Sequence, residues 1–94
     1  MAEIGLESVV AAAARQVSAE TDGETAILEL EGGVYYGLDR TGTAVWRRIR
    51  EPVTVEAVCR DLDVEYAADP ATLRADVLRL LGELVEAGLV EVRG

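Results

Sequence analysis

The hydrophobic and polar positions along the chain change their period near residue 39. Before that point, residues 15–20, 24–30 and 34–38 alternate or are rich in Val, Leu and Tyr, which is typical of β-strands. An Asp-Gly pair separates the first two segments and a Gly-Gly pair separates the second from the third, and both pairs favour tight turns. This part of the chain is therefore predicted to form a three-stranded antiparallel sheet.

Apolar residues after residue 39 recur every three or four positions and predict helices. The first helix begins at a capping residue, Asp39 or Thr41, and ends at about residue 50, ahead of Pro52. The second begins at Thr54, and its apolar residues fall at i, i+3, i+4 and i+7. These residues are Val55, Val58, Cys59 and Leu62. Both helices are thus expected to bury one face.

The third predicted helix has the clearest boundaries. It begins at Asp69-Pro70, an N-cap followed by proline in the first helical position, and runs to Ala87, where Gly88 closes it. Residues 89–92 follow as a short strand or tail. The order of elements predicts an α+β fold that resembles a winged helix-turn-helix, within a single domain over residues 1–94.

Two segments give a weaker signal. Residues 1–14 fit a short helix, part of a first strand or a loose N-terminal arm, and these alternatives stay open. Residues 63–69 connect the second and third helices, and Tyr66 is expected to pack inward there. Neither segment changes the predicted order of strands and helices.

Apolar side chains span roughly half the circumference of the third helix, whereas a stripe of about 100° is enough to face a core. The stripe consists of Leu73, Val77, Leu78, Leu80, Leu81, Leu84 and Val85. Something must cover the extra width. A peptide that adds to the edge of strand 34–38 and lies against this helix is one candidate. Ordinary core packing and a homodimer contact remain alternatives of similar weight.

The charge of the chain limits its partners. Nine basic residues, all Arg, stand against 18 acidic ones, which gives a net charge of −9. Nucleic-acid binding depends on clustered basic residues, so this balance disfavours it. The alternative of an acidic winged-helix DNA-binding regulator rests on the helix order alone. A neutral or basic peptide suits the charge better.

Residue types also disfavour an enzyme. The chain has no His, so the commonest general base and metal ligand is absent, and the sequence predicts neither a cofactor nor a metal site. Cys59 is the sole thiol and lies on the apolar face of the second helix, which favours a structural role. A sole cysteine cannot form an internal disulfide and favours a reducing compartment. With no apolar run near the ~20 residues of a membrane helix, a cytoplasmic location is expected.

The segment from Tyr35 to Trp46 reads Tyr-Tyr-Gly-Leu-Asp-Arg-Thr-Gly-Thr-Ala-Val-Trp and joins an aromatic strand to a helix through one capped turn. It resembles the core signature of the PqqD-like family, the precursor peptide recognition elements of pathways to ribosomally synthesised, modified peptides. The helix from Asp76 to Val85 and the Gly-Leu-Val that follows it are similar to the end of the same family domain. The resemblance covers about residues 15–92.

The resemblance implies a non-catalytic winged-helix domain that binds the leader segment of a precursor peptide. In this family the leader adds as a strand beside the third strand and lies against the third helix. A discrete chain of this length most resembles the stand-alone B1 proteins of lasso-peptide pathways. That implies a B2-type leader peptidase and an ATP-dependent lasso cyclase as partners, and a monomer is favoured over a homodimer.

Carried over by position, the resemblance also implies peptide-binding residues. The strand edge would be supplied by Val34, Tyr35 and Tyr36. The helix side would be lined by Arg74, Val77, Leu78, Leu81 and Val85. Asp69 and Asp76 would meet Lys or Arg of a basic leader. A register shift of one residue would exchange the two faces of the strand.

Overall fold

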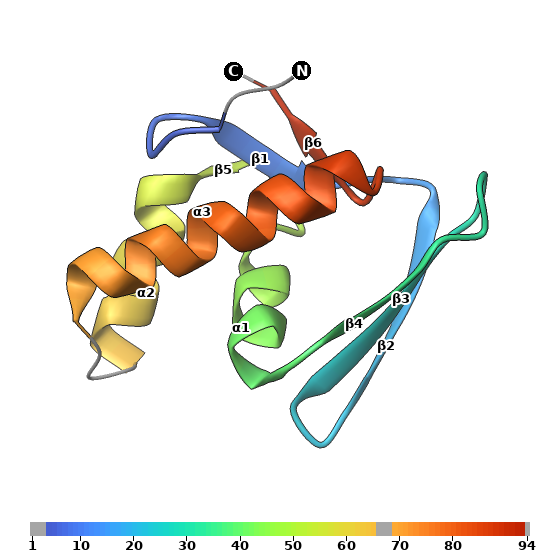
Figure 1. Cartoon of the computed structure of the whole chain (residues 1–94), viewed down its shortest axis with the longest axis horizontal. Coiled ribbons are helices and arrows are strands. Elements are labelled where there is room, and N and C mark those ends of the chain that lie inside the picture. The colour runs from blue at the N-terminus through green and yellow to red at the C-terminus, as the bar shows by residue number, and fades with distance from the viewer. Residues whose placement is uncertain (1–3, 66–68, 94) are drawn as a thin grey trace.

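The computed structural model describes residues 4–65 and 69–93, and it shows an α+β domain (Figure 1). Three helices follow an antiparallel sheet, which confirms the predicted class and order. The elements are β1 (Val9–Ala12), β2 (Gln16–Thr21), β3 (Glu24–Glu29), β4 (Tyr35–Leu38), α1 (Arg40–Arg48), β5 (Val53–Thr54), α2 (Val55–Glu65), α3 (Pro70–Glu86) and β6 (Val90–Val92). The expected inward packing of Tyr66 lies outside the described residues.

The predicted antiparallel sheet is present with strand order β2-β3-β4. Asp22 and Gly23 form the turn between β2 and β3 with positive φ angles of 54° and 80°. An Asp-Gly pair suits this turn because glycine adopts such angles without steric cost and aspartate tolerates them. Gly33, with φ 71°, lies in the turn between β3 and β4. The two turns hold the three strands in consecutive antiparallel pairs.

A second sheet, with strand order β5-β1-β6, was not predicted. Its central strand is β1, so of the three alternatives for residues 1–14 the structure shows a strand over Val9–Ala12. Residues 89–92, expected as a short strand or tail, contain the strand β6. Val10 of β1 pairs with Val53 of β5 on one side and with Val92 of β6 on the other. The sheet thus joins three short segments that are far apart in the sequence, and each is too short to show a clear alternation on its own.

α1 covers one face of the β2-β3-β4 sheet. The Asp39 side chain caps this helix by accepting a hydrogen bond of 2.8 Å from the Gly42 amide, as the sequence predicts. Thr25 of β3 and Thr43 of α1 are buried and share a hydrogen bond of 2.7 Å between their hydroxyls. Trp46 is 2% exposed and lies under the sheet, with its indole nitrogen 3.4 Å from Ser18 Oγ. These contacts fix α1 against the inner face of the sheet.

α2 and α3 complete the core. α2 runs to Glu65 and so includes residues 63–65, which were expected to belong to the connection, whereas α3 ends at Glu86, one residue before its predicted end. Thr54 opens α2 as the sequence predicts, because its hydroxyl accepts a hydrogen bond of 3.2 Å from the Ala57 amide.

Asp69 caps α3 through Oδ2, which accepts from the Thr72 amide at 3.1 Å. Gly88 follows its last turn with a φ of 79°. No helix in the described ranges combines the length and the hydropathy that a membrane crossing requires.

Candidate functional site

β4 is an edge strand, since it pairs with β3 and with no other strand in residues 4–65 and 69–93. The Glu29 amide donates a hydrogen bond of 2.8 Å to the Val34 carbonyl, and this pair has the same register as the pairs between β3 and β4. Pairs of this kind alternate along an antiparallel ladder with pairs whose backbone groups point outward. The alternation directs the amide and carbonyl groups of Tyr35 and Gly37 to the open edge. This edge can therefore accept a further strand.

A side-chain hydrogen bond joins β4 to the C-terminal half of α3. The Tyr36 hydroxyl donates a hydrogen bond of 2.5 Å to Glu83 Oε1. Tyr36 and Tyr35 are neighbours in an extended strand, so their side chains point to opposite faces of the sheet. Tyr36 is partly buried against the helix, whereas Tyr35 is 70% exposed. Only the first of these two side chains faces α3.

The contact with Tyr36 identifies the flank of α3 that faces β4. Residues at i, i+4, i+7 and i+11 lie on one side of a helix, and those that share the side of Glu83 are Asp76, Leu80 and Ala87. Leu80 and Ala87 are partly buried, whereas Asp76 and Glu83 are exposed. We call Asp76, Leu80, Glu83 and Ala87 the β4 flank of α3. Of the predicted peptide-binding residues, only Asp76 belongs to this flank. Leu80 is part of the predicted apolar stripe, but neither Leu80 nor Glu83 was predicted to bind the peptide.

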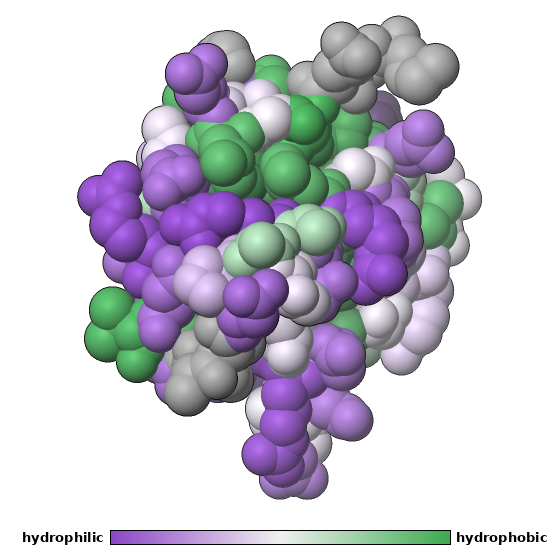
Figure 2. All heavy atoms as spheres, turned by 60° about the vertical axis from the view of Figure 1, so that its left-hand side comes forward, coloured by the Kyte–Doolittle hydropathy of each residue, from purple (hydrophilic) through white to green (hydrophobic). Residues whose placement is uncertain are grey.

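Arg74, Leu78 and Val85 lie on the opposite flank of α3. Arg74 forms ion pairs with Asp63 at 3.0 Å and Glu56 at 3.2 Å, both on α2, and these carboxylates raise its pKa. Figure 2, which brings the side with α2 forward, shows hydrophilic residues across the middle of the face and hydrophobic ones above them. The structure thus does not bring these three predicted site residues together with β4.

The remaining predicted site residues occupy three kinds of position. Val77 and Leu81 are 1% and 0% exposed and belong to the core. Asp69 is exposed, but its Oδ2 already accepts hydrogen bonds from the amide and the hydroxyl of Thr72. Val34 precedes β4 and is 40% exposed. Among the predicted residues, Tyr36 makes a side-chain hydrogen bond from β4 to α3. Asp76 shares the side of Glu83 but is paired with Arg79 of the same helix at 3.6 Å.

The contact between Tyr36 and Glu83 has a measurable consequence. The pKa of Tyr36 is raised above its ordinary value. The main cause is the hydrogen bond to the Glu83 carboxylate, and burial is the second. The contribution of this contact to stability is present below the ordinary tyrosine pKa and is lost as pH rises through the raised one. We expect Glu83→Gln to lower the pKa of Tyr36, measured by NMR of the tyrosine ring carbons during alkaline titration. An unchanged midpoint would mean that the contact does not form in solution.

The described residues offer little for catalysis. Cys59 is buried in the core, and burial raises the pKa of its thiol, which disfavours the reactive thiolate. In the part of the chain that the structure describes, no three Cys, Asp or Glu side chains gather into a group that could hold a metal ion.

This chain is similar to a protein family and to a solved structure. The family model described as coenzyme PQQ synthesis protein D (PqqD) matches residues 24–90. The fold is similar to a solved structure, "TbiB1 in Complex with the TbiA(beta) Leader Peptide", with 30% sequence identity and a TM-score of 0.81. The likeness covers 89% of this chain and 98% of that one. A search of curated proteins found no match.

Proposed function

Because the chain belongs to the PqqD family, we propose that it is a non-catalytic module that binds the leader segment of a ribosomal precursor peptide. The leader pairs with the open edge of β4 and lies against the β4 flank of α3. The proposal includes delivery of the bound leader to a leader peptidase and a lasso cyclase in the cytoplasm, with this chain acting as a monomer.

One observation carries the proposal: the similar TbiB1 structure was solved with a leader peptide. Two features of this chain support the location of the site. Tyr35 and Gly37 direct backbone groups to the edge of β4, and main-chain pairing supplies affinity that depends little on the sequence of the peptide. Leu80 and Glu83 then offer an apolar and a charged contact beside that edge, which can select particular leaders.

The proposal is tested by fluorescence polarisation, with a labelled leader peptide from the neighbouring precursor gene titrated against the purified chain. We expect saturable binding of the native leader and none of a scrambled leader of the same composition. A folded chain that fails to bind the native leader, or binds both peptides equally, would contradict leader recognition.

The flank of α3 that binds the leader can be identified with two matched variants. Leu80→Gln and Leu78→Gln alter partly buried leucines on opposite flanks of one helix. We expect Leu80→Gln to raise the leader Kd by about tenfold, a loss of ~1.4 kcal/mol, because it removes an apolar contact from the β4 flank. Leu78→Gln should bind nearly as the wild type does. The reverse ranking, with both variants folded by circular dichroism, would favour the flank carried over from the family resemblance.

A further inference from the structure

The face of the β2-β3-β4 sheet that points away from α1 is apolar and exposed. Val17, Leu28 and Tyr35 pair in register across the three strands and are 54%, 39% and 70% exposed. Ile27, the neighbour of Leu28 in β3, points to the other face and is 0% exposed. Three large apolar side chains in one row thus remain open to solvent, although β3 buries Thr25, Ile27 and Glu29 on the opposite face. We call this surface the outer face.

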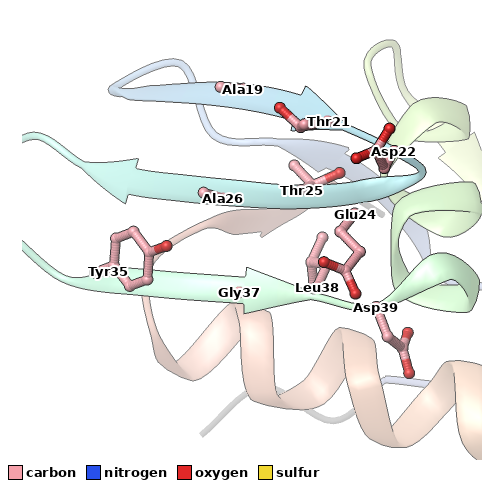
Figure 3. Close-up of a pocket in the computed structure, with 10 residues that line it drawn as sticks. All are labelled: Ala19, Thr21, Asp22, Glu24, Thr25, Ala26, Tyr35, Gly37, Leu38 and Asp39. Carbon is pink, nitrogen blue, oxygen red and sulfur yellow. The ribbon is translucent and has the colours of Figure 1, made fainter.

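Beside this row, the outer face is flat. Ala19, Ala26 and Gly37 pair with one another across the strands, so the next row carries no side-chain atom beyond Cβ. A Cβ added at Gly37 would meet no atom within 4 Å. A shallow groove of about 520 Å³ runs over this floor, with Tyr35 toward one end (Figure 3). An apolar side chain from another molecule can therefore lie directly on the backbone of the sheet.

The other end of the groove is acidic. Asp22, Glu24 and Asp39 line it and lie together at the end away from Tyr35 (Figure 3). Arg40 approaches the same turn, where its Cγ lies 3.5 Å from the position of a Cβ on Gly23. Three carboxylates against one guanidinium leave this end negative, in a chain whose net charge is already −9. A positively charged side chain of a binding partner is therefore favoured at this end of the groove.

We propose that the outer face is a second docking surface, for a segment of a partner protein that presents an apolar side chain followed by Lys or Arg. The apolar side chain lies over Ala19, Ala26 and Gly37, and the cation lies at the acidic end. A second copy of this chain fits less well, because it would bring a further charge of −9 and the same carboxylates. The surface goes beyond the proposed leader site, which uses the edge of β4 and the face toward α3.

The experiment uses a phage-displayed library of random peptides selected on the immobilised full chain. We expect the enriched peptides to share an apolar residue followed by Lys or Arg. Binding of a synthetic enriched peptide should fall by about tenfold or more in Val17→Glu, which places a charge on the strand farthest from β4. The matched control is Val64→Glu, since Val64 on α2 is 88% exposed and lies outside the outer face. This control should bind as the wild type does.

The acidic end is tested separately with the double variant Asp22→Asn and Glu24→Gln. Asn keeps the positive φ at position 22 accessible, so the turn is retained. Peptide binding should weaken and lose most of its salt dependence, while Glu51→Gln, an exposed site elsewhere, should change neither.

Four outcomes would overturn the proposal. These are no enrichment, equal loss of binding in Val17→Glu and Val64→Glu, displacement of the enriched peptide by the leader, and a concentration-dependent doubling of mass by light scattering that Val17→Glu abolishes. The affinity of Val17→Glu for the leader peptide distinguishes docking on the outer face from leader binding at β4. Unchanged leader affinity is expected, because the variant leaves β4 and α3 intact.

Discussion

Gly37→Pro is expected to raise the Kd of the leader peptide by about tenfold or more, because it removes a backbone donor that points to the open edge of β4. A leader carbonyl left without this partner costs about 1–3 kcal/mol. The ladder between β3 and β4 should survive, since proline is tolerated in edge strands where its nitrogen faces outward. Fluorescence polarisation measures the affinity, and circular dichroism checks the fold.

Gly37→Ala is the matched control for this change. It adds a Cβ into open space on the outer face and keeps the amide. Leader binding close to that of the wild type is therefore expected. If the alanine and proline variants bind equally, whether both strongly or both weakly, then the amide of residue 37 does not pair with the leader and strand addition at this edge is wrong.

Leu81→Ala should lower the free energy of unfolding by about 2–5 kcal/mol, because Leu81 is fully buried at the centre of the apolar stripe of α3. Urea denaturation followed by circular dichroism measures the change. Val64→Ala, at an exposed apolar position on α2, should stay within about 0.5 kcal/mol of the wild type. A small effect at Leu81 would mean that the core is not packed as described.

The same burial alters how site variants should be designed. The family resemblance implies that Leu81 lines the peptide groove, and a charge there would be expected to abolish binding. In the structure, Leu81→Glu would place an unpaired charge in the core and unfold the domain. Lost binding in that variant would carry no information about the groove. Leu80 and Gly37 report on the site without this ambiguity.

The sequence predicts those elements of the fold that depend on local chemistry. Asp39 and Asp69 cap their helices because each carboxylate reaches an amide three residues away. Gly23 and Gly88 lie where a positive φ is required. The prediction of three strands and three helices in order follows from signals of this kind and is confirmed. None of these signals depends on what the element packs against.

The features of the fold that the sequence did not predict depend on contacts between residues far apart in the chain. β1, β5 and β6 form a sheet only because Val10 meets Val53 and Val92, and no local pattern shows such pairs. Which flank of α3 faces β4 likewise depends on the contact between Tyr36 and Glu83, 47 positions apart. An apolar stripe that spans half a helix does not show which of its edges borders the sheet. The choice between Leu78 and Leu80 therefore needed the tertiary structure.

The pairing of β1 with β6 brings the first and last strands of the described chain side by side. Val10 is opposite Val92, and Figure 1 shows β6 at the opposite end of the domain from the lower end of β4. A host enzyme can thus carry this fold as an insertion in one surface loop, with both junctions at neighbouring points and the open edge of β4 unobstructed. A circularly permuted chain, with a short linker between the ends of β6 and β1 and new termini in the β2–β3 turn, should keep the same fold.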